Sequence, residues 1–184
     1  MLEDMSEGAA RIKRIVEDLK DYARQDTEAR KEPFDLNSVT QAALRLVDTS
    51  IRKATADCVA DYCEELPQVE GNALRIEQVI VNLLINACQA LPSAERGIYL
   101  ATSCDRAAGL VRLTIRDEGV GIPPESLNRL TDPFFTTKRE SGGTGLGLSI
   151  SAGIVQEHGG SLSFDSPPGR GTTATLTLPM TQGG

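Results

Sequence analysis

Four glycines stand within six positions of the sequence, at Gly142, Gly143, Gly145 and Gly147. Residues 148–158 follow directly, and their pattern predicts a helix. Glycine lets backbone N–H groups converge without hindrance from Cβ, and the start of a helix carries partial positive charge, so this arrangement is typical of an anion site, most often for phosphate. Taken alone, the run equally fits a flexible loop before a helix. No lysine follows it as in a Walker loop, and no strand leads directly into it as in a dinucleotide fingerprint.

A second informative segment, residues 72–91, carries amide side chains on an otherwise apolar helix. Its apolar residues cover more than one helical face, which predicts a largely buried helix. Gln78, Asn82, Asn86 and Gln89 fall on one narrow stripe. Because a buried amide without a partner costs about 1–3 kcal/mol, we expect these side chains to face a ligand, a metal ion or a wet cavity. The simpler alternative, favoured by this segment alone, is that they satisfy one another or nearby backbone.

A third segment places an acid beside two closely spaced glycines. Asp117 ends a predicted strand and is followed by Gly119 and Gly121. Its carboxylate could accept a hydrogen bond from an amino group, while the bare glycine backbone lets a flat ring approach. On its own the segment also fits an ordinary acidic turn.

The elements that must position these residues are predicted by hydrophobic periodicity and turn signals. Asn37 or Ser38 is expected to cap a helix that carries Val39, Ala42 and Leu46, and residues 66–71 are expected to be a connection. Residues 97–104 and 110–116 alternate and predict a hairpin around the loop 105–109. The other predicted elements are a strand within residues 54–62, a short helix over 124–130, and two final strands over 161–165 and 172–178.

The N-terminal residues 1–30 have a different pattern. Apolar residues from Leu2 to Ala23 recur three and four apart, which is the spacing of a coiled-coil seam. We therefore expect a long amphipathic helix that associates with a second helix, in preference to packing on its own domain. Residues 25–32 are polar and are interpreted as a linker or a fraying helix end.

Composition limits the possible classes of protein. The chain has 184 residues, 40% of them hydrophobic, and a formal charge of -7, which fits one core with an appendage and argues against a nucleic-acid partner. No apolar run has the length of a membrane span, so we expect a cytoplasmic fragment, and a membrane anchor elsewhere in a longer parent stays open. The four cysteines lack metal-ligand spacing and are expected to be reduced core residues, namely Cys58, Cys63, Cys88 and Cys104.

Taken together, the motifs resemble the four boxes of the histidine-kinase catalytic domain, in the same order. They are Asn82 with Asn86, Asp117-x-Gly119-x-Gly121, residues 133–138 (Pro-Phe-Phe-Thr-Thr-Lys), and Gly143-x-Gly145-x-Gly147. That domain belongs to the superfamily that includes gyrase, mismatch-repair and heat-shock chaperone ATPases. The resemblance implies an α/β (α+β) fold for residues 31–184, a two-layer sandwich with a mixed sheet. Residues 1–30 resemble the second helix of the family's dimerisation and phosphotransfer hairpin.

The resemblance also implies a site for ATP and Mg²⁺. Asn86 would coordinate the metal with Asn82 in support, and Asp117 would accept from the adenine amino group, with Thr172 helping through water. Phe134 and Phe135 would anchor a lid of about residues 131–145. Lys138 or Arg139 could reach the terminal phosphate, and Lys138 is the candidate catalytic residue. The remaining implied ATP-binding residues lie in the two glycine-containing motifs, namely Gly119, Gly121, Ile122, Gly143, Thr144, Gly145, Leu146, Gly147 and Leu148.

Two departures from the family pattern qualify the expected activity. Gln89 stands where many members carry a basic residue. The family's phospho-accepting histidine lies on the first hairpin helix, whereas this chain begins in the second. The sole histidine, His158, lacks the flanking acid of an acceptor and is expected to pack at a helix end. We therefore expect a fragment that binds ATP and phosphorylates a histidine on the first helix of its own dimerisation hairpin, a helix that is missing here. The phosphoryl group would then pass to a response regulator receiver domain. The full-length protein is expected to be a homodimer.

Three other functions share parts of this pattern. ATP-hydrolysing members of the superfamily place a glutamate base where Asn82 stands, and an amide cannot take a proton from water. A serine kinase of the anti-sigma type would have the same nucleotide site without needing the heptad helix. A non-catalytic dimerising scaffold would keep that helix and bind no nucleotide.

Overall fold

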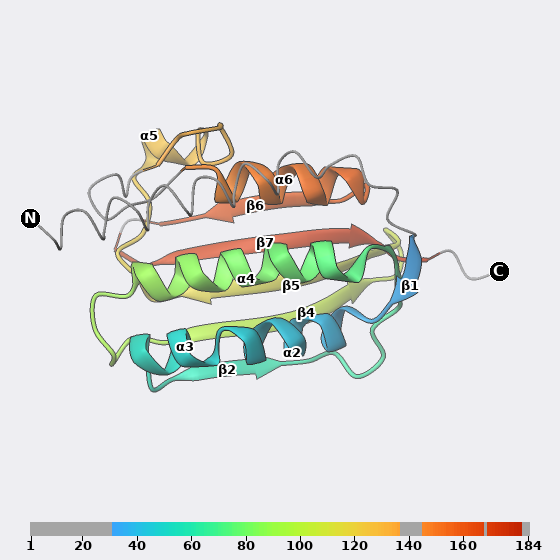
Figure 1. Cartoon of the computed structure of the whole chain (residues 1–184), viewed down its shortest axis with the longest axis horizontal. Helices are drawn as coiled ribbons and strands as arrows, with labels where there is room; N and C mark the ends of the chain where they lie inside the picture. The colour runs from blue at the N-terminus through green and yellow to red at the C-terminus, as the bar shows by residue number, and fades with distance from the viewer. Residues whose placement is uncertain (1–30, 137–144, 168, 182–184) are drawn as a thin grey trace, which may run out of the picture.

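The computed structural model describes residues 31–136, 145–167 and 169–181. The predicted N-terminal helix of residues 1–30, Lys138, Gly143 and Thr144 lie outside these ranges. The described chain forms a layer of helices over one face of a mixed sheet, which confirms the predicted two-layer α+β class (Figure 1).

The sheet has five strands in the order β2-β4-β5-β7-β6. These strands are β2 (Cys58–Asp61), β4 (Ile98–Asp105), β5 (Leu110–Asp117), β6 (Ser161–Asp165) and β7 (Thr172–Pro179). Among these five described strands, only β2 and β4 pair in parallel, and β4 and β5 form the predicted hairpin. Buried and partly buried side chains alternate along β5 and β7, so one face of the sheet is apolar and is covered by helices. Asp117 ends the buried row of β5, directly opposite Thr172.

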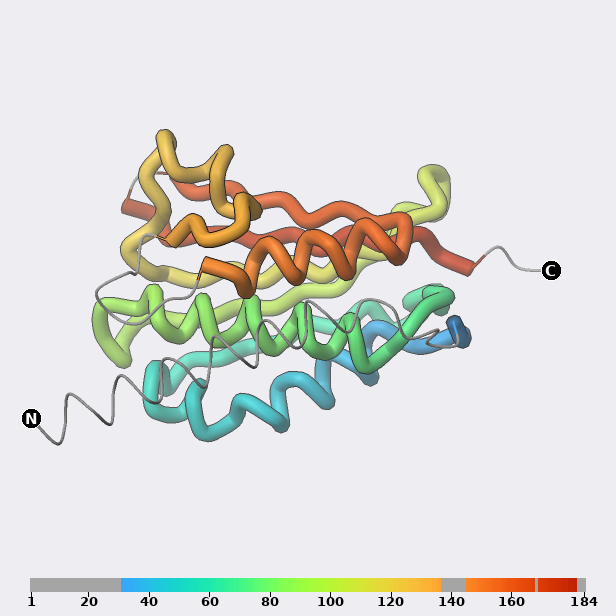
Figure 2. Tube along the Cα trace, turned by 45° about the horizontal axis from the view of Figure 1, so that its top comes forward, coloured from blue at the N-terminus to red at the C-terminus, as the bar shows by residue number. Residues whose placement is uncertain are grey.

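The central helix α4 (Ala73–Ala90) lies between α2 (Leu36–Leu46) and α6 (Gly147–Glu157), as the views in Figures 1 and 2 agree. The short helix α3 (Asp48–Ala54) also packs on α4. Ile76, Val79, Ile80 and Leu84 of α4 have no exposed surface. The prediction of a largely buried helix over residues 72–91 is confirmed, and Asn72 caps it by accepting from the N–H groups of Leu74 and Arg75.

Two local predictions are wrong. Asp35, and neither Asn37 nor Ser38, is the N-cap of α2, because its carboxylate accepts hydrogen bonds from the N–H groups of both those residues at 3.1 Å. The connection predicted over residues 66–71 contains strand β3 (Val69–Gly71), which pairs antiparallel with β1 (Glu32–Phe34). A strand of three residues is too short for alternation to show in the sequence, although its Val69 is fully buried.

The remaining elements are close to their predicted positions. The strand predicted within residues 54–62 is confined to β2, since α3 continues to Ala54, and the short helix α5 (Pro124–Leu127) begins as expected. The four cysteines are free and half-buried, and burial raises the pKa of the thiols of Cys58 and Cys88. Among the described residues, no helix is both long enough and apolar enough to cross a bilayer.

Candidate nucleotide-binding site

One face of α4 links the sequence motifs that lie far apart in the chain. Asn82, Asn86 and Ala90 recur every four residues and therefore share that face, which we call the amide face of α4. Asn82 and Asn86 are half-buried, whereas Gln89, predicted on the same stripe, is exposed. The rise of a helix places Asn82 about 12 Å from Ala90 along the axis. Different motifs adjoin the two ends of this face.

The Ala90 end of the amide face packs against the turn that follows β5. The N–H of Val120 donates to the carbonyl of Ala90 at 3.0 Å. A Cβ added to Gly119 would lie 2.7 Å from both the Cβ and the carbonyl oxygen of Ala90. Any larger residue at position 119 would push the turn away from α4, so this glycine is required by the close approach.

Asp117 is held in one orientation at this end. It is 6% exposed, and its Oδ1 accepts hydrogen bonds from the N–H of Gly119 at 2.8 Å and from the N–H of Thr172 at 3.2 Å. These two bonds join the turn after β5 to the first residue of β7. The carboxylate therefore has a fixed position beside Gly119, in the same region as the C-terminal end of the amide face.

The loop between β6 and β7 packs against the turn that follows β5. Gly171 has a φ of +75°, and a Cβ at this position would collide with the carbonyl oxygen of Asp117. Only glycine combines this left-handed conformation with such a close approach. The predicted residues Gly121 and Thr172 also lie here: a Cβ on Gly121 would be 3.1 Å from the hydroxyl oxygen of Ser166, and Thr172 is 8% exposed.

Ser166 is a site residue that the sequence analysis missed. Its buried Oγ accepts from the N–H of Ile122 at 2.7 Å, donates to the carbonyl of Gly171 at 2.8 Å, and lies 3.2 Å from Oγ1 of Thr172. One hydroxyl thus fastens the loop to the turn. A serine directly after a strand carries no periodic signal, because its role depends on a loop brought close only by the fold.

The Asn82 end of the amide face contacts the first turns of α6. The side-chain amide of Asn82 donates to Oγ of Ser151 at 2.9 Å, and a Cβ on Gly147 would lie 2.7 Å from Oδ1 of Asn82. The N-cap residue of α6, Leu146, makes no side-chain cap hydrogen bond. A helix start without a side-chain cap presents N–H groups with partial positive charge, which suits an anion such as phosphate.

The phenylalanine motif meets the end of the glycine run. A Cβ on Gly145 would lie 2.5 Å from the carbonyl carbon of Phe134 and 2.8 Å from the carbonyl oxygens of Phe134 and Phe135. Phe134 has a φ of 64° and is 63% exposed. The guanidinium carbon of Arg129 lies over the ring of Phe135, 4.5 Å from the ring centroid. The described ends of the predicted lid therefore contact one another.

The structure brings most predicted site residues to this region, with differences in what they offer. The side chain of Leu148 packs against the hydrophobic core, and Leu146 is 4% exposed, so near the glycine run these two residues offer backbone rather than apolar side chains.

Among the described residues, no group of three or more His, Cys, Asp or Glu side chains could hold a metal ion. The oxygen of an amide such as Asn86 fits Mg²⁺, which usually takes one or two protein ligands and completes its shell with water and phosphate.

His158 packs at a helix end, as expected. It is 8% exposed; its Nε2 accepts from the N–H of Asn72 at 2.9 Å, and its Nδ1 lies 2.7 Å from the carbonyl of Ile154. Because both ring nitrogens are engaged, the neutral ring with hydrogen on Nδ1 satisfies both contacts. The histidine joins the end of α6 to the start of α4 and has a structural role.

The geometry agrees with the comparison of the chain with known proteins. Residues 71–182 match the family model described as histidine kinase-, DNA gyrase B- and HSP90-like ATPase. The chain belongs to this ATPase family. The solved structure of the catalytic domain of histidine kinase ThkA is 32% identical to this chain and superposes with a TM-score of 0.73. The match covers 84% of this chain and 100% of the ThkA domain. This likeness identifies the chain as a catalytic domain of the sensor histidine kinase type.

Longer proteins of the family show that such a domain occurs within larger chains. The sensor histidine kinase ZraS of Escherichia coli K12 is 35% identical over 176 residues, which are 96% of this chain and 37% of ZraS. A structure of histidine kinase ThkA in complex with the response regulator protein TrrA is 28% identical, with a TM-score of 0.78, over 96% of this chain and 49% of that one. The chain therefore spans well under two thirds of these proteins.

Proposed function

We propose that this chain binds Mg·ATP along the amide face of α4 and serves a two-component sensor kinase by transferring the γ-phosphoryl group to a histidine. The observation that carries the proposal is that Asp117 and the start of α6 adjoin opposite ends of the amide face of α4. The family's ATPase description and the histidine kinase relatives support the use of ATP.

The adenine would lie at the Asp117 end. The backbone N–H groups of Gly119 and Thr172 hold Oδ1 of Asp117 in place, so that this carboxylate can accept a hydrogen bond from the exocyclic amino group of adenine. Thr172 would assist through a water molecule, and the bare backbone at Gly119 and Gly121 would let the flat ring approach, with Ile122 beside it. Ser166 would keep this surface in place before the nucleotide arrives.

The phosphates would lie at the Asn82 end, against the start of α6. Backbone N–H groups of Gly145 and Gly147, together with those of Gly143 and Thr144, would donate to phosphate oxygens. Asn86 would hold Mg²⁺ with Asn82 in support, and the bound ion would neutralise charge on the phosphates. Phe134 would anchor the lid, and Lys138 would reach the terminal phosphate. The protein's task in such a transfer is positioning and charge stabilisation.

Asn82 favours transfer to a protein over hydrolysis. Its amide nitrogen donates to Ser151, and a carboxamide cannot act as a general base toward water. In the full-length protein the acceptor histidine would stand on a dimerisation hairpin, to which residues 1–30 would also belong. The ThkA–TrrA complex supports a response regulator receiver domain as the next partner.

Phosphoryl transfer to a separate hairpin tests the proposal. The chain is incubated with labelled Mg·ATP and a hairpin peptide carrying the acceptor histidine, and acid-labile label on that histidine is expected. Steady phosphate release without label on the peptide, abolished by Asn82→Ala, would favour an ATPase. Acid-stable label on serine would favour a serine kinase, and absence of Mg·ATP binding at about 1 mM would leave a scaffold.

A further inference from the structure

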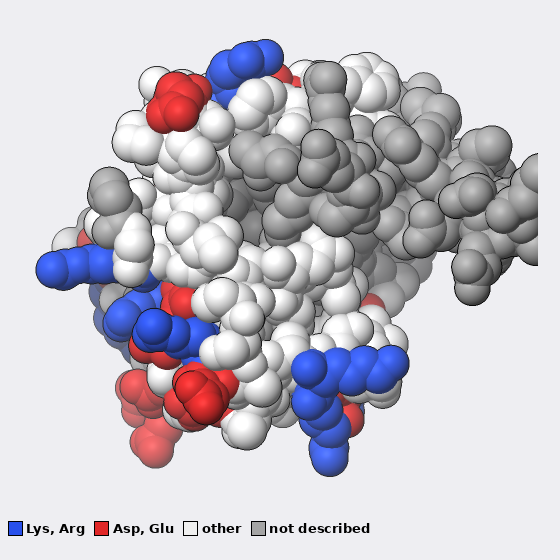
Figure 3. Space-filling model, turned by 90° about the vertical axis from the view of Figure 1, so that its left-hand side faces the viewer, with Lys and Arg blue, Asp and Glu red and all other residues white. Residues whose placement is uncertain are grey.

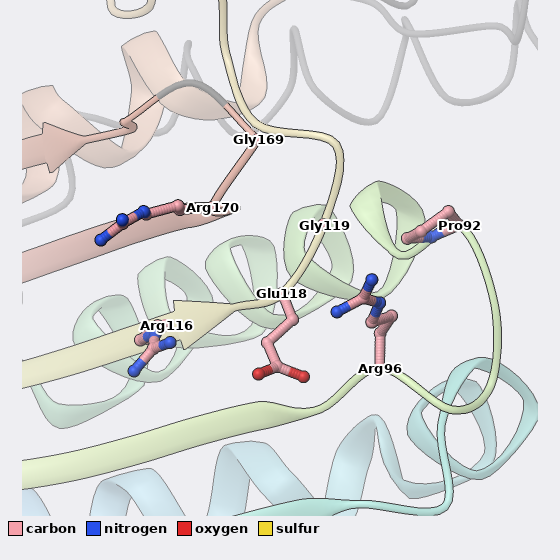
Figure 4. Close-up of a pocket in the computed structure, with 7 residues that line it drawn as sticks. All are labelled: Pro92, Arg96, Arg116, Glu118, Gly119, Gly169 and Arg170. Carbon is pink, nitrogen blue, oxygen red and sulfur yellow. The ribbon is translucent and has the colours of Figure 1, made fainter.

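A cavity lies at the same end of the sheet as the turn after β5. It has a volume of 380 Å³ and is lined by residues from three loops and from β5: Pro92, Arg96, Arg116, Glu118, Gly119, Gly169 and Arg170 (Figure 4). Successive residues of a strand point to opposite faces, so Arg116 lies on the other face of the sheet from Asp117, and Glu118 directly follows the end of β5. The side chain of Arg116 and the carboxylate of Asp117 are therefore on opposite faces of β5, and the cavity and the proposed adenine site adjoin at Gly119, which borders both.

The cavity gathers positive charge on an acidic protein. Three arginines line it with one carboxylate, which leaves two positive charges uncompensated, although the whole chain has a formal charge of -7. The arginines come from separate segments, namely the α4–β4 connection, β5 and the β6–β7 loop, so the fold and not local sequence brings them together. In the end-on view, Lys and Arg side chains lie beside Asp and Glu at the left, and others lie at the top and at the lower right (Figure 3).

The guanidinium groups of the three arginines have no carboxylate partner among the described residues. Within the described part of the chain, the side chains of Arg96, Arg116 and Arg170 make no ion pair and no hydrogen bond. The guanidinium carbon of Arg116 lies over the Tyr99 ring, 5.9 Å from the ring centroid. Glu118 is instead used by the backbone, since its Oε2 accepts from the N–H of Gly97 at 3.0 Å. Figure 4 shows its carboxylate between the side chains of Arg116 and Arg96.

We propose that this cavity binds the phosphate group of a small phosphomonoester. A phosphomonoester carries close to two negative charges at neutral pH, which matches the two uncompensated positive charges, and arginine forks fit phosphate oxygens with paired N–H donors. A volume of 380 Å³ falls within the range of small-molecule sites, so a phosphate with a small organic body fits. The fixed Glu118 disfavours ligands with further negative charge beside the phosphate.

The test is a titration of the whole chain with phosphate-containing probes, monitored by nuclear magnetic resonance. The titration is made at about pH 7.5 with Mg²⁺ and a non-hydrolysable ATP analogue present. The probes are ribose 5-phosphate and inorganic phosphate, with ribose as the uncharged control. Saturable shifts of the backbone signals of Arg96, Glu118 and Arg170, with a dissociation constant below about 10 mM, are expected for a phosphate probe and not for ribose. The tighter of the two probes shows whether the organic body contributes.

A pair of charge-matched variants assigns the binding to the cavity. Arg116→Ala with Arg170→Ala is expected to weaken phosphate binding at least about tenfold, whereas Arg106→Ala with Arg112→Ala removes equal charge outside the cavity and is expected to leave it unchanged. A third double variant, Arg96→Ala with Arg116→Ala, gives the same test without touching the β6–β7 loop. Binding should also weaken below about pH 6, where the phosphomonoester becomes a monoanion.

Two results would overturn the assignment. One is the absence of saturable shifts with either phosphate probe up to about 10 mM. The other is equal binding by the cavity variants and the Arg106/Arg112 variant. Neither depends on the nucleotide, because the proposed ATP site is scored separately by the signals of Asn86 and Asp117, so failure of one proposal leaves the other to be judged alone.

Discussion

The two ends of the amide face of α4 are built differently. At the Asp117 end, a buried carboxylate and the buried hydroxyl of Ser166 accept or donate hydrogen bonds that join the turn after β5 to the β6–β7 loop. At the Asn82 end, Phe134 is 63% exposed with a positive φ, and the N-cap residue of α6, Leu146, makes no side-chain cap hydrogen bond. We infer that the first end is fixed by the chain itself, whereas the second depends on its ligand.

The largest effect is expected from Gly171→Ala. The new Cβ would collide with the carbonyl oxygen of Asp117 and would also hold a left-handed φ, so the free energy of unfolding should fall by about 2–5 kcal/mol. Denaturant unfolding measures it. Gly169→Ala is the matched control: its φ of +71° is nearly the same, but nothing lies within 4 Å, so a loss of only about 1–2 kcal/mol is expected. Equal losses would contradict the close packing of the Asp117 end.

Ser166→Ala should have the next largest effect. It leaves the N–H of Ile122 and the carbonyl of Gly171 without their partner, so the free energy of unfolding should fall by about 1–3 kcal/mol. Hydrogen exchange of the Ile122 amide should speed up together with this loss. The control is Ser163→Ala, an exposed position on β6, where a change within about 0.5 kcal/mol is expected. A silent Ser166→Ala would show that the loop is held by other contacts.

The smallest effect on stability is expected at the other end, from Phe134→Ala. Because this ring is largely exposed, the free energy of unfolding should change by less than about 0.5 kcal/mol, while the affinity for Mg·ATP falls. Ile150→Ala on α6 is the contrast, since a buried side chain of this size costs about 2–5 kcal/mol. Thermal unfolding and nucleotide titration measure the two quantities. A large loss of stability in Phe134→Ala would remove the distinction between the two ends.

Several parts of this architecture could be predicted because their signals are local. The apolar faces of α4 and the alternation of β4 and β5 are long enough to define element type, and the hairpin loop between them is marked by Gly109. The order of the asparagine, aspartate, phenylalanine and glycine motifs then indicated the family and the residues to examine. Here, long periodic segments and motif order carried the prediction.

Other parts could not be predicted because they depend on contacts between distant segments. The strands β1 and β3 have three residues each and exist through their pairing, and Asp35 caps α2 in competition with two residues of similar capping ability. Ser166 and the arginines at 96, 116 and 170 acquire their roles only where loops converge. Such convergence leaves no pattern in the sequence.

The most direct test of the account is a titration of the chain with Mg·ATP, compared between the wild type and Asp117→Asn. The asparagine can still accept from Gly119 and Thr172 but turns a donor toward the adenine amino group, so the fold should persist while nucleotide affinity falls about 10- to 100-fold. Asp105→Asn, an acidic position at the far end of β4, should bind as the wild type does. Equal binding by the wild type and Asp117→Asn, or no binding by the wild type at about 1 mM, would contradict the nucleotide site.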